Sequence, residues 1–464
     1  MSKILFNAGP FSASQYWQTS KKHCVKGVQS LAVAVLLSLA NTTWAQDKST
    51  NLTLEQAISR VQSYQQSQGL WQTQQQIAEA NLKQTKLWQN PSLAVEQKGF
   101  SSGKDKELTV GISQELDVFG QRRANQQLAQ IAQSQAELNQ RIYQGQVDLV
   151  VKYLWSQLAI LELERDVVME QLKVSQENLT AIEKRYRAGS IAQVEVDRVR
   201  MSHAENLRLY QQADLQLQVA TQQLSNLWGE ADKTINIGLN VQNLWPNSTE
   251  KQVQQYLQEN LAEKSRQLNV LESKATVNAL KAQARPNPSV NLGVTNSRSP
   301  EAGTDSQLSL GVSIPLNIFN RNQYGVQIAQ AKQQQLERQK DFYTKQNILE
   351  INTLLTELQG LQLQFKQVDQ SQIPLAIQVQ QKTLQGFTAG KFALTDVQQA
   401  TLQLQDIRLR KVQLLKDAWQ RAVEAESLSL GIEPSQVMAK DALSQINQSI
   451  WKDTQALPVI GGER

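Results

Sequence analysis

The chain has 464 residues, with few glycines and prolines, an ordinary share of charged residues and a formal net charge of +5. This composition favours long helices over a compact mixed fold. Four of the 47 basic residues and none of the 42 acidic residues lie in the first 45 positions. The rest of the chain is therefore nearly neutral, and no nucleic-acid partner is expected.

Residues 1–45 are predicted to form a secretory signal peptide. Lys21, Lys22 and Lys26 precede the apolar run Leu31–Ala40, and Thr43 and Ala45 supply small residues for cleavage. The one cysteine, Cys24, lies before the apolar run, so the mature chain would have no thiol for a disulfide or a thiolate metal site. No later segment is apolar enough for a transmembrane helix, so strands would have to make any membrane contact.

A first structural repeat is predicted at residues 46–230. It begins with a helix that Thr53 caps and that runs to about Leu87, before Pro91. Alternating apolar and polar residues then predict a β-hairpin over residues 91–117. The second strand of this hairpin carries its apolar side chains on one face: Leu108, Val110 and Ile112.

A long helical hairpin over residues 121–228 completes this repeat. Its first helix, ending near Arg187, would be roughly 100 Å long at 1.5 Å per residue. Apolar residues recur in it at alternating steps of four and three, broken at Arg165 and Ser175, which predicts supercoiling against partner helices. The members of this seam are Val147, Val151, Leu154, Leu158, Leu161, Val168, Leu172, Leu179, Ile182 and Tyr186.

The second repeat, residues 250–432, is predicted to have the same order. A helix leads to a β-hairpin over residues 288–316, whose loop is expected at Asn296–Asp305, and to a long helical hairpin over residues 321–430. Pro374 is expected to disturb that hairpin because it lacks a backbone donor. A second heptad seam follows: Val397, Ala400, Leu404, Ile407, Leu414 and Ala418. Residues 231–249 are interpreted as a linker, and residues 433–464 as a weakly structured C-terminal tail.

Each long hairpin turns at a glycine, Gly189 in the first repeat and Gly390 in the second, 201 residues later. A helix that ends and reverses needs a left-handed residue, which glycine adopts without penalty.

Four strands with one apolar face cannot close a barrel, and open sheet edges are not tolerated in lipid. Three chains would supply about twelve strands, which is within the range of outer-membrane barrels. The alternative is a pair of small soluble sheets that cap coiled coils. The predicted fold is mainly α with a membrane β-barrel portion: duplicated long helical hairpins form a trimeric α-barrel continuous with a shared, roughly 12-stranded β-barrel.

The duplicated order, the Asn-Pro-Ser entry to each hairpin (Asn90 and Asn287) and the two glycine turns resemble the TolC-like outer-membrane factor family across residues 50–432. The segment Ser113–Arg123 and the general spacing resemble the CzcC-type channels of heavy-metal efflux systems. The resemblance implies a homotrimeric exit duct in the outer membrane of a Gram-negative bacterium, extending into the periplasm. Its partners would be a periplasmic adaptor protein, an inner-membrane transporter of the resistance-nodulation-division class, and outer-membrane lipid.

In this family the helical tips contact the adaptor and close the resting channel. The tip positions here are Gly189, Ser190, Ile191, Gly390, Lys391 and Phe392. Asp396 matches the acidic gate position, and Glu195 is its equivalent in the first repeat. Gln399 stands where related channels have a second acidic residue, so the sequence departs from the family there.

Asp396 has two interpretations. Three copies around an axis would form an acidic ring that favours cations. The alternative is a carboxylate that stabilises the N-terminus of its own helix. Likewise, the arginines near Glu195 (Arg185, Arg187, Arg198 and Arg200) could hold a closed state or be solvated charges.

No nucleophile–base pair, phosphate loop or metal-ligand cluster is present in the sequence, so neither an enzyme nor a cofactor is expected. His203, the one histidine after residue 45, is interpreted as a lone helix-face residue. The leading hypothesis is a passive efflux channel for divalent heavy-metal cations. The alternatives are a channel for drugs or for type I protein secretion, and, more distantly, a periplasmic coiled-coil adaptor.

Overall fold

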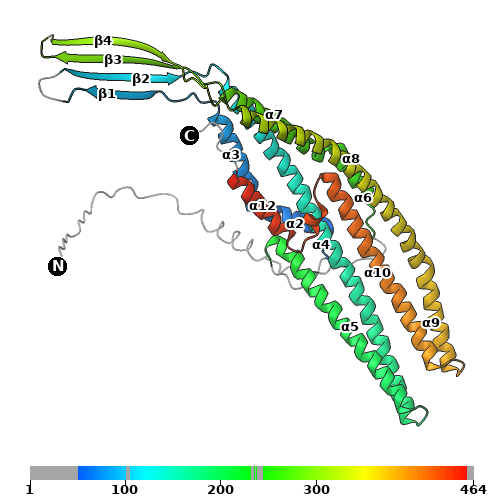
Figure 1. The fold of residues 1–464 in the computed structure, drawn as a ribbon. Helices are drawn as coiled ribbons and strands as arrows, with labels where there is room; N and C mark the ends of the chain where they lie inside the picture. The colour runs from blue at the N-terminus through cyan, green and yellow to red at the C-terminus, as the bar shows by residue number, and fades with distance from the viewer. Residues whose placement is uncertain are drawn as a thin grey trace, which may run out of the picture. The chain divides into compact units, whose positions relative to one another are not determined.

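The computed structural model describes residues 51–100, 105–230, 235, 237, 244–301 and 303–456. Along these residues the chain runs through helices, then two strands, then helices, and repeats this order (Figure 1). The elements of the first repeat are α2 (Leu54–Ser67), α3 (Leu70–Gln84), β1 (Ser92–Lys98), β2 (Lys106–Glu115), α4 (Gln121–Arg187) and α5 (Gln193–Ser225). Those that follow are α6 (Thr249–Glu259), α7 (Leu261–Gln283), β3 (Ser289–Ser299), β4 (Gly303–Ser313), α8 (Gln323–Gln367), α9 (Ile373–Thr388), α10 (Leu394–Leu430), α11 (Pro434–Met438) and α12 (Ala442–Ala456). The predicted signal peptide lies outside the described residues.

The helix that precedes each hairpin is interrupted, although the sequence predicts one continuous helix in both places. Thr53 caps α2 as predicted, through a reciprocal pair of hydrogen bonds with Gln56. A left-handed backbone at Gly69 then separates α2 from α3, and Asn260, with a φ of +53°, separates α6 from α7. Single residues of this conformation do not interrupt an apolar helical pattern, so the periodicity did not reveal them.

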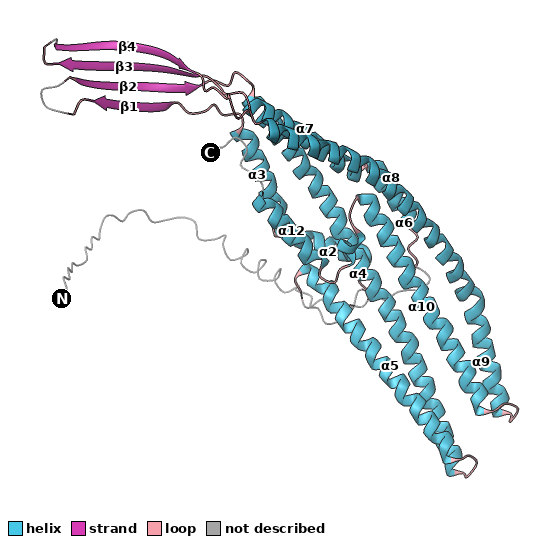
Figure 2. Ribbon diagram, in the orientation of Figure 1, coloured by secondary structure: helices cyan, strands magenta, loops and turns pink. Residues whose placement is uncertain are grey.

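The four strands form one antiparallel sheet in the order β1-β2-β3-β4 (Figure 2). The central pair, β2 and β3, joins the two repeats: Val110 lies opposite both Val95 of β1 and Val294 of β3. The predicted apolar face is confirmed, and it is exposed in the single chain. On the other face, the hydroxyls of Thr109 and Thr295 are 3.0 Å apart.

The second hairpin is longer than predicted. The expected loop, Asn296–Asp305, is largely strand, because β3 continues to Ser299 and β4 begins at Gly303. Its apolar alternation stops at Val294, but the backbone pairing continues with polar side chains, as where Asn296 donates to the Ser306 hydroxyl. Pairing of strands depends on backbone groups, which the apolar pattern does not report.

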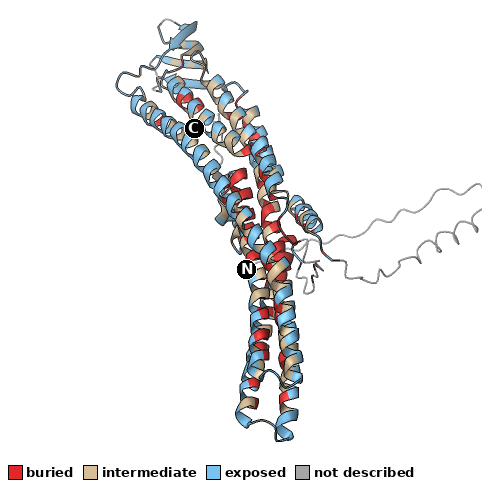
Figure 3. Ribbon diagram, turned by 90° about the vertical axis from the view of Figure 1, so that its right-hand side faces the viewer, coloured by how far each residue is buried: buried red, intermediate tan, exposed pale blue. Residues whose placement is uncertain are grey.

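The long helices pack along one another through the predicted seams. Val147, Val151 and Leu158 of α4 are each no more than 2% exposed, whereas Tyr186, at the end of the seam, is exposed. Helix α10 buries Val397, Ala400, Leu404, Leu414 and Ala418. Buried positions gather along the helices, and the strands are mostly exposed (Figure 3).

The predicted disturbance at Pro374 is confirmed. The segment Val368–Gln372, between α8 and α9, is a π-helix, which accommodates the proline ring and its missing donor. Lys411 of α10 forms an ion pair with Asp369 in this segment.

The interpretation of residues after 433 as a weakly structured tail is wrong. Helices α11 and α12 pack on the main core and bury five apolar side chains: Val437, Ala442, Leu443, Ile446 and Ile450. Of the predicted linker 231–249, Ile237, Leu244 and Trp245 also belong to this core, and the indole of Trp419 donates to the Leu244 carbonyl (2.7 Å). Residues 231–234, 236 and 238–243 lie outside the described part of the chain.

One buried ion pair crosses the core between the repeats. The ammonium of Lys152 on α4 lies 2.6 and 2.8 Å from the two carboxylate oxygens of Glu426 on α10. Their side chains are 10% and 1% exposed, and the indole ring of Trp419 lies beside the ammonium. None of the helices in the described ranges is long and apolar enough to cross a membrane.

Candidate functional site at the helical turns

Both long hairpins reverse at the same end of the helices, at the lower right of Figure 1, where the α4–α5 turn and the α9–α10 turn lie. In the first turn, the amide of Gly189 donates to the Tyr186 carbonyl and the amide of Ser190 donates to that of Arg185 (2.9 and 3.0 Å). In the second, the amides of Gly390 and Lys391 make the same two bonds to Phe387 and Gly386 (3.0 and 2.8 Å). This is the Schellman motif, which satisfies carbonyls that a helix end leaves open.

The two glycines are required by conformation and not by space. Gly189 has a φ of +74° and Gly390 a φ of +73°, and nothing lies within 4 Å of where a Cβ would stand. A larger side chain would meet no neighbour but would occupy the left-handed region at a cost.

Gly390→Ala is expected to lower the free energy of unfolding by about 1 kcal/mol, the cost of a left-handed non-glycine residue. Gly360→Ala, inside α8, is the matched control, because its Cβ would also stand in open space. That variant is expected to gain roughly 0.5–1 kcal/mol, since alanine is the better helix former. Denaturant unfolding in detergent measures, for each variant, whether the free energy of unfolding falls or rises. A loss of the same size in both would contradict the conformational explanation.

The residues that follow the two glycines differ in their surroundings. Ile191 packs against the small cluster of Ile182, Val196 and Val199. Phe392 is half exposed, and its ring lies directly on Gly386, where a Cβ would come within 2.2 Å of it. Ser190 and Lys391 are exposed. The second turn therefore presents an aromatic ring and a cation, and the first turn does not.

Two contacts that the sequence did not predict join the turns. Leu394, in the first turn of α10, packs on the Ile182 cluster of the other hairpin. The guanidinium of Arg185 lies 4.2 Å from the ring centroid of Phe387, a cation–π contact between α4 and α9. Neither contact has a signal in the periodicity, because each joins positions about 200 residues apart.

The predicted gate residues are accessible and lie near the turns. Asp396 is exposed, and its carboxylate accepts the backbone N–H of Ala393 (2.8 Å), which is the helix-stabilising role given above as the alternative. Gln399 is exposed one turn further along α10. Glu195, at the equivalent position of α5, pairs with Arg198 (3.1 Å). The two acidic residues thus differ, because Glu195 pairs with a cation and Asp396 accepts from a backbone N–H.

Other polar residues near the first turn have partners within the hairpin. Arg200 pairs with Glu183 of α4 (3.0 Å) and lies 3.7 Å from Asp197. The prediction of a lone helix-face histidine missed one contact, because Nδ1 of His203 lies 3.0 Å from the hydroxyl of Ser175 on α4. Ser175 is one of the two breaks in the α4 seam, so a polar contact replaces an apolar one there. In the described part of the chain, no three metal-ligating side chains converge.

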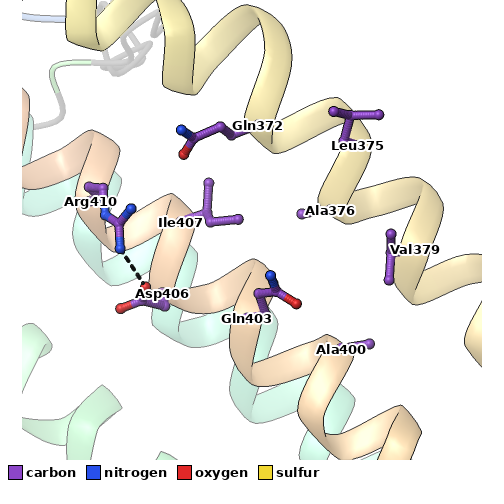
Figure 4. Close-up of a pocket in the computed structure, with 9 residues that line it drawn as sticks. All are labelled: Gln372, Leu375, Ala376, Val379, Ala400, Gln403, Asp406, Ile407 and Arg410. Carbon is purple, nitrogen blue, oxygen red and sulfur yellow. Dashed lines mark hydrogen bonds and ion pairs between the residues drawn. The ribbon is translucent and has the colours of Figure 1, made fainter.

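A pocket of about 350 Å³ lies between α9 and α10, just beyond the π-helix (Figure 4). Leu375, Ala376 and Val379 face Ala400 and Ile407 across it. Asp406 and Arg410 on its α10 side bond to each other (3.0 Å). The pocket holds no nucleophile and no acid–base pair that could act on a substrate.

Residues 90–230 match the sequence profile of the family described as "Outer membrane efflux protein", a segment that runs from the first β-hairpin to the end of α5. Over these residues the chain is similar to the outer membrane efflux proteins.

Comparisons over the whole chain agree. The cobalt-zinc-cadmium resistance protein CzcC of Cupriavidus metallidurans is 24% identical over 383 residues, which cover 81% of this chain and 90% of CzcC. The structure of CusC has a TM-score of 0.66 at 17% identity, covering 82% of this chain and 93% of that one. VceC of Vibrio cholerae has a TM-score of 0.64 at 16% identity, covering 82% and 96%. The likeness to CusC and VceC is a likeness of fold.

Proposed function

We propose that this chain is an outer membrane efflux channel, that it is the passive exit duct of a tripartite pump, and that it exports divalent heavy-metal cations. The observation that best supports a channel is the four-stranded sheet with one exposed apolar face. This sheet is continuous along the chain with two long helical hairpins. Its partners would be a periplasmic adaptor and an inner-membrane transporter of the resistance-nodulation-division class.

The sheet supports a homotrimer. Its apolar residues lie on one face and are between 41% and 75% exposed: Leu93, Val95, Leu108, Val110, Ile112, Leu292, Val294, Leu308, Leu310 and Val312. The outer edges of β1 and β4 pair with no strand in the described chain. A sheet with open edges is not tolerated in lipid, so three copies would join these edges into a barrel of about twelve strands. The helices would continue it as an α-barrel into the periplasm.

The turns are the proposed contact with the adaptor and the proposed gate. Gly189, Ser190 and Ile191, together with Gly390, Lys391 and Phe392, would form the docking surface. Asp396 and Gln399, with Glu195 in the first repeat, would surround the narrow periplasmic end. Support comes from the exposure of all of these residues except the partly buried Ile191 and Glu195, and from the position of both turns at one end of the helices.

The metal substrate is supported by the name of the relative CzcC, a cobalt-zinc-cadmium resistance protein, and by the whole-chain match to it. In this proposal the duct needs no metal ligands of its own, because selection would take place upstream in the transporter.

Deletion of the gene is expected to lower tolerance to zinc, cadmium, cobalt, copper or silver, measured as growth over a concentration series, with drugs as the parallel series. Sensitivity to drugs alone would contradict the metal substrate and leave the channel proposal intact.

Fractionation tests the channel proposal itself. The proposal predicts detergent-solubilised trimers in the outer-membrane fraction. Recovery as a soluble periplasmic monomer would favour the adaptor alternative.

A further inference from the structure

A second pocket of about 350 Å³ lies where the strands of the second repeat, β3 and β4, meet the helices α7 and α8. Two arginines line it: Arg285, which follows α7, and Arg321, which precedes α8. Phe119 of the first repeat and the segment from Ile314 to Ile318 complete its wall. The pocket thus combines two permanent positive charges with an apolar surface.

Nothing in the described chain neutralises these two charges. No hydrogen bond or ion pair of either guanidinium is found among the described residues. The two carboxylates that end the neighbouring strand have other partners: Glu115 accepts from the amide of Asn287 (3.0 Å), and Asp117 accepts the first two backbone N–H groups of α4. The arginines are therefore free to hold an anion.

The apolar wall continues the exposed face of the sheet. Ile314, Leu316 and Ile318 are 58%, 77% and 60% exposed, and the adjoining Phe319 is 93% exposed. Large apolar side chains with such high exposure at the end of a sheet are costly in water. They are typical of the boundary between lipid tails and headgroups.

The equivalent place in the first repeat carries different side chains. Trp88 stands where the second repeat has Arg285, and the guanidinium of Arg122 lies 4.5 Å from the centroid of its ring. Gln121 stands where the second repeat has Arg321, and its amide donates to the carbonyls of Ala282 and Arg285 (3.3 and 3.0 Å). At these two positions the first repeat therefore has a tryptophan and a glutamine in place of the two arginines.

We propose that this pocket binds one anionic phospholipid per chain. The phosphate would be held by Arg285 and Arg321, and an acyl chain would lie along Leu316, Ile318 and Phe119. A guanidinium fits a phosphate with paired N–H donors, and the largely apolar wall favours a lipid over a free anion. The inference rests on the proposed function only in placing this junction at the membrane surface.

The test uses the full-length protein, purified in non-ionic detergent, stripped of lipid and titrated with phosphatidylglycerol or phosphatidylcholine under native mass spectrometry. The unmodified protein is expected to retain one phosphatidylglycerol per chain in preference to phosphatidylcholine. The double variant Arg285→Gln/Arg321→Gln is expected to bind phosphatidylglycerol about tenfold more weakly or worse. The control Arg123→Gln/Arg338→Gln removes the same charge from two exposed positions that do not line the pocket and should bind as the unmodified protein does.

Equal retention of the two lipids by the unmodified protein would overturn the proposal without use of any variant. Unchanged binding by the double variant would also overturn it. Inorganic phosphate is expected not to displace the lipid at matched concentration; displacement would show a free-anion site instead. Single-channel recording in bilayers of the same lipids separates this inference from the proposed function. If the unmodified protein conducts but shows no lipid preference in the mass-spectrometry titration, the inference alone is refuted. If the unmodified protein does not conduct, the channel proposal is refuted.

Discussion

Lys152→Met is expected to lower the free energy of unfolding by about 3–5 kcal/mol, because it leaves the carboxylate of Glu426 buried without a cation. Glu426 is 1% exposed, and both of its carboxylate oxygens accept from the ammonium of Lys152. The pair joins α4 of one repeat to α10 of the other, so the loss falls on the packing between the repeats. Denaturant unfolding in detergent, compared with the unmodified protein, measures it.

The loss is expected to depend on pH in a defined direction. Burial raises the pKa of Glu426 above its ordinary value of 4.5, and the ammonium of Lys152 opposes this rise. Without Lys152 the pKa of Glu426 in the folded protein rises further, so this carboxyl holds a proton in the folded chain that it releases in the unfolded chain. The stability of Lys152→Met therefore increases as the pH falls through the interval between 4.5 and the raised pKa, and decreases as the pH rises through it.

Two controls separate the buried charge from the loss of a side chain. Lys416→Met breaks the pair with Glu164, whose side chains are 29% and 22% exposed, and is expected to cost less than about 1 kcal/mol. The double variant Lys152→Met/Glu426→Leu removes both charges and is expected to recover most of the stability. A double variant as unstable as Lys152→Met would show that packing, and not an unpaired charge, causes the loss.

Asp396→Ala is expected to raise the single-channel conductance in planar bilayers by about twofold or more, if three such carboxylates line the narrow end as proposed. The structure adds a second role that this variant also removes, because the carboxylate accepts the backbone N–H of Ala393.

Asp396→Asn separates the two roles, since the amide oxygen still caps α10 but carries no charge. A gate that depends on charge changes its conductance and cation preference in both variants. A change in the alanine variant alone would assign the effect to the helix cap, and unchanged conductance in both would remove Asp396 from the gate. Gln399→Ala, one turn further along α10, is the uncharged control.

Local pattern was sufficient for much of the fold. Six of the ten seam positions of α4 are buried, because a helix that packs along its length repeats the same contact every few residues. Alternation predicted the apolar face of the sheet, and Pro374 predicted a disturbance of the helix, which the structure shows to be a π-helix. Where the pattern is short, prediction failed, as with α12, whose few apolar residues gave no sustained period and yet pack on the core.

The sequence by itself determined the repeated order of helices and strands, the two left-handed glycine turns and the apolar face of the sheet, since each depends on residues close together in the chain. Only the tertiary structure decided which distant residues meet. Packing between the repeats brings Lys152 to Glu426 and Arg185 to Phe387. The two arginines of the junction pocket meet because β3 pairs with β4 within the second repeat. A charge or a ring on a helix face has many geometrically equivalent partners in sequence, and the relative placement of two helices selects one of them.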